Sequence, residues 1–189
     1  HYIEVNLVLK GMRGEPCIAQ SVLPYVNVDM VSYSSYEAIK NRSFSEKQTQ
    51  LQTVFDYLEK QLQPKAGLPF ARRVYIGEYG YHANSNKPES FEKQYNETKD
   101  IMKISLALNL PFALHWQMYN NEYEANGESK QMSLINEEGN RMPLYFLHQK
   151  FYQKMNSFIQ QYRKTNRSYP SDALFRQKAI QLLDEDVFK

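Results

Sequence analysis

The feature that most constrains this chain is the regular alternation of β-prone runs with amphipathic segments. Four runs rich in Val, Ile, Leu and aromatic residues have the length and composition of strands: residues 2–9, 26–33, 74–78 and 111–118. Each is followed by a segment in which apolar residues recur at helical spacing. Strands that alternate with helices in this way form parallel βαβ units. The order therefore predicts an α/β fold.

Helix start and stop signals support this order. The sequence SEKQ predicts a capping box in which Ser45 is the N-cap and Gln48 reaches back to it, and Pro64 and Gly67 end the helix that follows. Further helices are predicted over residues 16–25, 91–108, 143–162 and 171–183, the last with Ser171 as its N-cap. We therefore expect four strand–helix units followed by a tail helix.

A parallel α/β chain is either a doubly wound sheet or a barrel. No Gly-rich phosphate loop follows a predicted strand, which argues against a nucleotide-binding doubly wound sheet. Polar or aromatic residues instead lie at or just beyond the C-terminal strand ends, where barrels carry their chemistry: Asn6, Tyr36, Glu78 and Trp116. We therefore predict TIM-barrel-type (β/α) units.

Composition argues against several classes of function. The 189 residues carry a formal net charge of +2 and no long basic run, so no nucleic-acid partner is expected. No stretch is long and apolar enough to span a membrane, so no membrane partner is expected either. His82, His115 and Glu78 lack the tight spacing of zinc ligands, and Cys17, the single cysteine, has no evident neighbouring base. We expect no metal and no cofactor.

Glu78 is the first candidate for catalysis. The apolar run VYI ends in this carboxylate, which lies between Gly77 and Gly80, two residues that leave room for backbone or ligand. A carboxylate at the mouth of an apolar sheet loses solvation, which hydrogen bonds or a reaction partner must offset. The alternative is a strand-end glutamate that is solvated or paired with Arg72 or Arg73.

Two aromatic residues accompany this glutamate. Trp116, the sole tryptophan, ends the fourth predicted strand, and an indole there can stack on the apolar face of a sugar. Tyr36 follows the second strand, where a phenol can hydrogen-bond a carboxylate on a neighbouring strand. The alternatives are a core tryptophan and one ordinary tyrosine among 15.

The stretches VDMVSYSSY, VYIGEYG and FALHWQMYNNE, followed by LINEEGNRMPLYFL, resemble the last three strands of clan A glycoside hydrolases, which are retaining (β/α)8 enzymes. The resemblance covers roughly residues 26–151. It implies that Glu78 is the nucleophile, that Tyr36 contacts and orients it, and that Trp116 stacks on the sugar at the subsite nearest cleavage. It also implies strands 5–8 of a barrel over residues 1–163, with a C-terminal tail helix over 164–189.

The chain departs from the family at two places. Ser34 occupies the position of a histidine that contacts the sugar, so the substrate class is open. The family's general acid/base, the Glu of an Asn-Glu pair on its fourth strand, is expected upstream of His1. Asn120 and Asn121 are further candidates for binding sugar hydroxyls, with an ordinary polar loop as the alternative.

These residues predict a parent enzyme that hydrolyses glycosidic bonds with retention, acting on a carbohydrate substrate. Whether this chain alone is an enzyme stays open, and we expect it to be inactive by itself. We also expect it to associate with itself or with its N-terminal half through open strand edges. The rival is a non-catalytic carbohydrate-binding or structural barrel. Sugar, linkage and compartment are not predicted, although a secreted or periplasmic parent fits the family.

Overall fold

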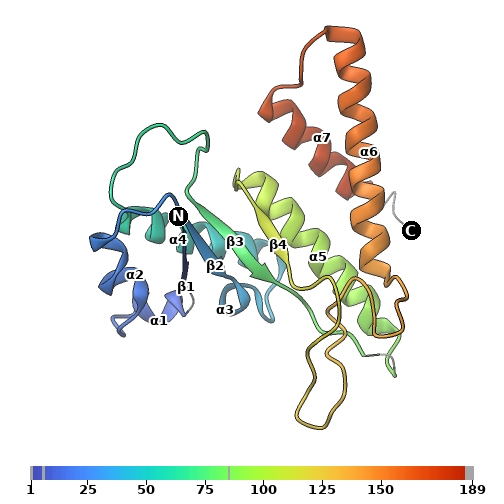
Figure 1. Ribbon diagram of the computed structural model, residues 1–189, viewed down its shortest axis with the longest axis horizontal. Helices are drawn as coiled ribbons and strands as arrows, with labels where there is room; N and C mark the ends of the chain where they lie inside the picture. The colour runs from blue at the N-terminus through green and yellow to red at the C-terminus, as the bar shows by residue number, and fades with distance from the viewer. Residues whose placement is uncertain (1, 6, 85, 186–189) are drawn as a thin grey trace. The chain divides into compact units, whose positions relative to one another are not determined.

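The computed structural model describes residues 2–5, 7–84 and 86–185, so the predicted site residue Asn6 lies outside the described residues. It is an α/β structure with a four-stranded sheet. All neighbouring strands are parallel, and their spatial order follows the chain: β1 (Tyr2–Val5), β2 (Met30–Ser34), β3 (Val74–Tyr79) and β4 (Ala113–His115) (Figure 1). The predicted α/β class is confirmed.

The chain forms two compact units. The sheet unit comprises His1–Tyr79 and Leu108–His115, and the helical unit comprises Gly80–Ala107 and Trp116–Lys189. The sheet unit holds the strands and five short or medium helices: α1 (Val8–Met12), α2 (Ile18–Ser21), the 3-10 helix η1 (Leu23–Tyr25), α3 (Tyr36–Ile39) and α4 (Phe44–Gln61).

One face of the sheet is covered within the sheet unit. Helix α4 packs on β3, and Tyr33 of β2 meets Phe55 of α4 edge to face, with ring centroids 5.9 Å apart. Both side chains are fully buried, as are three further apolar side chains of these two strands: Val31, Val74 and Ile76. Burial of this apolar area supplies most of the stabilisation of such a layer.

The opposite face of the sheet carries an aromatic cluster that is partly open. Tyr75 aligns with Ser32 across the parallel ladder, so the two share a face. Phe112 contacts both Tyr75 and Phe70 edge to face, at centroid distances of 5.5 and 5.7 Å. Phe112 and Leu114 are 44% and 50% exposed. Large apolar side chains on one sheet face are thus left in contact with solvent.

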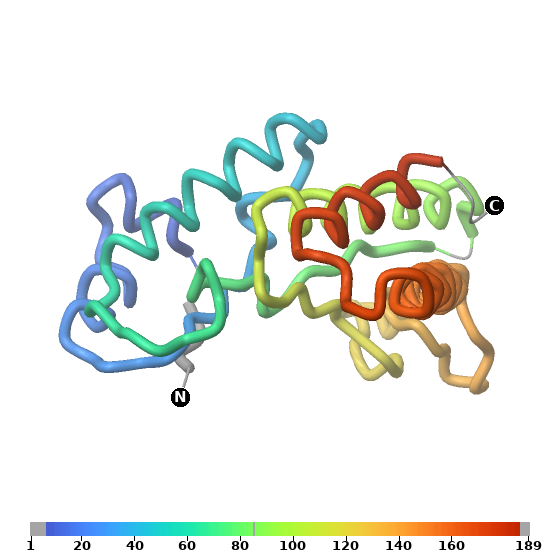
Figure 2. The backbone as a smooth tube through the Cα atoms, turned by 90° about the horizontal axis from the view of Figure 1, so that it is seen from above, coloured from blue at the N-terminus to red at the C-terminus, as the bar shows by residue number. Residues whose placement is uncertain are grey.

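The helical unit is built on α5 (Glu89–Ala107), α6 (Pro143–Asn166) and α7 (Asp172–Asp184), which pack against one another, as Figure 2 shows. Buried residues of α6 and α7 form one cluster, against which Tyr95, Met102 and Leu106 of α5 pack: Leu144, Leu147, Met155, Ala179, Leu182 and Leu183. The predicted cap of the tail helix is confirmed, since the Ser171 hydroxyl accepts a hydrogen bond from the Leu174 N–H. Among the described residues, no helix is long and apolar enough to cross a bilayer.

Several predicted strand boundaries are wrong. The first strand ends at Val5 rather than residue 9, because Leu7 adopts a left-handed conformation (φ 51°) and starts α1. The second strand begins at Met30, four residues later than predicted. The fourth is reduced to Ala113–His115, consistent with Pro111, whose nitrogen cannot donate to a ladder.

The predicted N-cap of α4 is also wrong. The capping box is formed by Ser43 and Glu46 rather than by Ser45 and Gln48. The Glu46 carboxylate accepts the Ser43 N–H at 2.8 Å, and the Ser43 hydroxyl accepts the Glu46 N–H. A carboxylate interacts more favourably than an amide with the positive N-terminal end of a helix, which explains why the earlier box forms.

Candidate functional site

Glu78 lies at the C-terminal end of β3, where the sequence predicted the catalytic carboxylate. It is half-buried and aligns with Ser34, the last residue of β2, after a register shift between Tyr33 and Ser34. The Ser34 hydroxyl donates a 3.1 Å hydrogen bond to Oε2 of Glu78. The structure therefore brings together two of the predicted site residues and orients one carboxylate oxygen.

The backbone of Glu78 is fixed as well. Its carbonyl oxygen accepts hydrogen bonds from both the N–H and the hydroxyl of Ser35, each 3.0 Å long. Ser35 is fully buried. Sequence reasoning missed this residue, although a serine directly after a strand end could have indicated a local backbone clamp. The end of β3 is thus held by its main chain as well as by its side chain.

Tyr36 is the first residue of α3 and is half-buried. Next to it, Oε1 of Glu37 accepts the Tyr33 hydroxyl at 3.2 Å and the Leu9 N–H at 2.9 Å. Burial raises the pKa of Tyr33 above its ordinary value, and the adjacent Glu37 carboxylate adds to that rise. Tyr33 is therefore a neutral donor to Glu37. The orienting role assigned to Tyr36 stays a prediction.

The alternative in which Glu78 pairs with Arg72 or Arg73 is wrong. These arginines precede β3, so roughly 16 Å of extended strand separates Arg73 from Glu78. Arg72 pairs with Asp56 at 3.0 Å, and Arg73 donates to backbone carbonyls including that of Gln63, at 2.7 Å. Both guanidinium groups are thus engaged at the opposite end of the strand.

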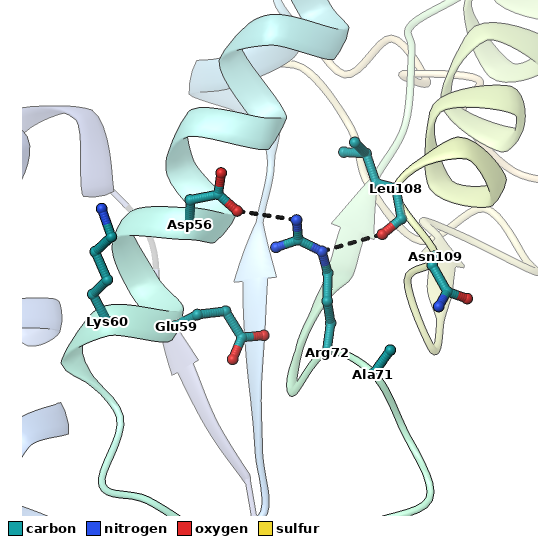
Figure 3. A pocket seen from close by; sticks show the side chains of 7 residues that line it. All are labelled: Asp56, Glu59, Lys60, Ala71, Arg72, Leu108 and Asn109. Atoms are coloured by element: carbon teal, nitrogen blue, oxygen red, sulfur yellow. Dashed lines mark hydrogen bonds and ion pairs between the residues drawn. The ribbon is translucent and has the colours of Figure 1, made fainter.

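A pocket lies at that opposite end, shown in Figure 3, and is lined by Asp56, Glu59, Lys60, Ala71, Arg72, Leu108 and Asn109. Arg72 bridges the Asp56 carboxylate and the Leu108 carbonyl oxygen. Glu59 accepts the backbone N–H groups of Arg73 and Val74 at 2.7 and 2.9 Å. These contacts pair the backbone N–H groups at the start of β3. We therefore assign the residues that line the pocket a role in stabilising the fold.

In the helical unit, Trp116 follows β4 directly in the chain. Its indole Nε1 donates a 3.0 Å hydrogen bond to Oε1 of Glu122, and Oε2 of Glu122 pairs with Lys130 at 3.0 Å. The peptide bond between Trp116 and Gln117 is cis. A Cβ on Gly80 would lie 2.5 Å from the Trp116 carbonyl oxygen, so this position admits only glycine without a backbone shift.

The other candidates lie in the same unit. Asn120 donates to Oε1 of Glu137 at 2.6 Å, and Asn121 is exposed. His82 forms a 3.2 Å pair with Glu124. Within the described part of the chain, no group of three or more His, Cys, Asp or Glu side chains is arranged to hold a metal ion.

Comparison of the chain with protein families, with curated proteins and with solved structures finds no significant match. Interpretation of the site therefore depends on its geometry. In the sheet unit, the half-buried carboxylate of Glu78 has one oxygen hydrogen-bonded to a neutral hydroxyl. In the helical unit, the carboxylate of Glu122 has one oxygen on an indole and the other on a cation. The Glu78 carboxylate, with one oxygen outside that hydrogen bond, is suited to react. The Glu122 carboxylate, with both oxygens engaged, is suited to hold Trp116 in place.

Proposed function

We propose that the chain forms strands 5–8 of a (β/α)8 barrel of the retaining glycoside hydrolase type, with Glu78 as the catalytic nucleophile. The observation that carries the proposal is the alignment of Glu78 with Ser34 at the C-terminal ends of two parallel strands. In β/α barrels, catalytic residues lie at that end of the strands. The four parallel strands, ordered in space as in the chain, support the barrel half.

The mechanism follows the retaining scheme. An oxygen of Glu78 attacks the anomeric carbon as the glycosidic C–O bond breaks, and an acid/base Glu outside these 189 residues protonates the leaving oxygen. The same acid/base then deprotonates water, which releases the sugar and restores the Glu78 carboxylate. Ser34 orients Glu78 through its hydrogen bond to Oε2, so Oε1 is the attacking atom. Trp116 stacks on the sugar, with Asn120 and Asn121 nearby in sequence as hydroxyl ligands.

The direct test is Glu78→Gln in the full-length parent. The amide keeps the shape and the acceptor for Ser34 but removes the nucleophile, so turnover is expected to fall at least about 10³-fold on every glycoside that the parent accepts. Glu138→Gln, an exposed loop substitution, is the matched control and keeps wild-type activity. Near-normal turnover by the Glu78→Gln enzyme would remove the assignment.

The second candidate is a barrel that binds carbohydrate without cleaving it. The observation in its favour is that a serine, bonded to Glu78, occupies the position where the family carries histidine. The encoded sequence upstream of His1 separates the two. An Asn-Glu pair at the end of the preceding strand supports the enzyme, and its absence supports the binding barrel.

We further propose that the sheet edges pair with four more strands, supplied by the N-terminal half or by a second copy of this chain. In the described sheet, β1 and β4 are the edges, and Phe112, just before β4, and Leu114, within β4, are exposed. Eight strands are the number at which side chains just fill a barrel. Sedimentation of the purified chain tests this, because a clean monomer at all micromolar concentrations would contradict self-association. The chain alone is expected to show no glycosidase turnover.

A further inference from the structure

Within the loop of residues 119–135, drawn in yellow to gold in Figure 1, residues 122–130 fold back on themselves as a hairpin. Tyr123 and Ser129 form an antiparallel bridge, and the Lys130 N–H donates to the Glu122 carbonyl oxygen at 3.2 Å. The two arms therefore place Glu122 and Lys130 opposite each other. Side chains opposite each other on antiparallel arms are within reach of a direct ion pair.

Both carboxylate oxygens of Glu122 accept hydrogen bonds from other side chains. Oε1 accepts the indole N–H of Trp116, and Oε2 accepts the Lys130 ammonium, each at 3.0 Å. The carboxylate raises the pKa of Lys130, chiefly through that hydrogen bond. The Glu122 and Lys130 side chains are 32% and 28% exposed, so the ion pair is partly buried.

The indole has a single hydrogen-bond donor, located on the edge of the ring. An acceptor fixed at that edge restricts rotation of the ring about its bond to Cβ. The acceptor is itself held by Lys130, so the orientation of the Trp116 ring is coupled to the fold of the loop. A ring held in this way keeps its flat face in one orientation.

We propose that Glu122, held by Lys130, is a positioning residue that fixes the orientation of the Trp116 ring plane. This orientation determines which pyranose faces the indole can stack on. This inference depends on the proposed function, in which Trp116 is the sugar platform. It assigns specificity to the 119–135 loop, since the hairpin carries both members of the pair. Glu122 itself takes no part in bond cleavage, because both oxygens are occupied and a cation balances its charge.

The test uses the fact that the chain has one tryptophan, so an ¹H–¹⁵N correlation spectrum contains a single indole cross-peak. In Glu122→Ala, exchange of the indole proton with water is expected to be about tenfold faster than in the wild type, the size expected for loss of a hydrogen bond to a charged acceptor. Glu122→Gln keeps an acceptor and restores part of the protection. Lys130→Gln keeps Glu122 but removes the ammonium group that pairs with it, so an intermediate exchange rate of the indole proton is expected.

Glu124→Gln is the matched control, because Glu124 belongs to the same hairpin but pairs with His82. Its indole exchange rate stays at the wild-type value. Backbone amide peaks show that each variant is folded, and Lys130→Gln keeps the test decisive if Glu122→Ala does not fold. Wild-type exchange in both Glu122→Ala and Lys130→Gln overturns the positioning role.

Titration with the methyl β-glycosides of glucose, mannose, galactose and xylose separates this inference from the proposed function. The wild-type indole peak is expected to shift with at least one of them, and Glu122→Gln to change the order of preference or weaken binding at least threefold. Unchanged preference in Glu122→Gln and Lys130→Gln overturns the specificity role. No response of the wild type to any of the four counts against the sugar platform itself, while the exchange rates still decide the positioning of the ring.

Discussion

The strand end that carries Glu78, in the sheet unit, and the loops around Gln94, in the helical unit, hold their polar groups by different means. In the sheet unit, strand register places Glu78 beside Ser34, and the Glu78 carbonyl oxygen accepts a hydrogen bond from the Ser35 hydroxyl. In the helical unit, the long connections are tied by side chains. Gln94, which is 2% exposed, donates to the carbonyl oxygens of Tyr81 and Gln131, both at 2.7 Å.

The difference teaches where substitutions are costly. A contact made by the register of parallel strands is shared among many backbone hydrogen bonds, so the loss of one side chain leaves the placement largely intact. A loop tied by one side-chain amide depends on that amide alone. Single substitutions of the tying side chains should therefore affect the helical unit more than equivalent changes affect the sheet unit.

The largest effect is expected for Gln94→Leu. Leucine fills similar space but leaves two carbonyl oxygens without their donor, which costs about 3 kcal/mol of unfolding free energy. Thermal unfolding followed by circular dichroism measures the change, with Gln153→Leu on the exposed side of α6 as control. If both variants melt together with the wild type, the loops are held by something other than Gln94.

Gly80→Ala is expected to cost about 2 kcal/mol, because its new Cβ would clash with the backbone carbonyl of Trp116. Gly67→Ala in the sheet unit is the comparison. Gly67 has a positive φ of 82° but no atom within 4 Å of the added Cβ, so only backbone strain of about 1 kcal/mol is expected. Equal losses in urea unfolding would show that close approach at Gly80 adds nothing.

Tyr33→Phe tests a buried side-chain contact in the sheet unit. Glu37 keeps its hydrogen bond from the Leu9 N–H, so the loss of the tyrosine hydroxyl is expected to cost about 1 kcal/mol. Tyr152→Phe on α6, where the tyrosine is 69% exposed, is the control and should be neutral. A loss as large as that of Gln94→Leu would contradict the contrast between the units.

The smallest expected effect is a difference in pH dependence. Burial lowers the pKa of His148 in α6 below its usual 6.5, so the unfolded chain binds more protons as the pH falls below about 6.5. The helical unit should then lose stability as the pH falls from 7 to 5, and His148→Gln should flatten that slope. In the sheet unit, burial raises the pKa of Tyr33 and Tyr79, so the stability that these two groups contribute is lost as the pH rises above about 10. Hydrogen exchange at pH 5 and pH 7 resolves the units, and uniform loss across both would contradict the assignment.

The predictable part of the molecule is the part determined by local pattern. The position of Glu78 at the end of a strand followed from a short β-prone run, and the Ser171 cap followed from a helix start signal. The capping residue of α4 was placed two residues late, since two boxes overlap in the sequence and only their interaction energies separate them. Strand ends at Val5 and Met30 were misplaced because apolar residues continue beyond the ladder.

The tying side chains could not be predicted. Gln94 and Glu122 bind groups 13 and 6 residues away in the chain, as well as groups in the returning loop, and glutamine or glutamate in a polar segment gives no local sign of such a contact. The Ser34 hydrogen bond to Glu78 spans 44 residues. Its geometry depends on the register shift at Tyr33, which arises only when the strands pair.

The single tryptophan has a practical consequence for anyone who studies this chain by fluorescence. Trp116 belongs to the helical unit, and its indole is bonded to the hairpin that follows it. Emission excited selectively in the tryptophan band therefore reports on the surroundings of this one indole. A denaturation curve recorded by this signal follows one local environment, and agreement with circular dichroism becomes a measure of how cooperatively the chain unfolds.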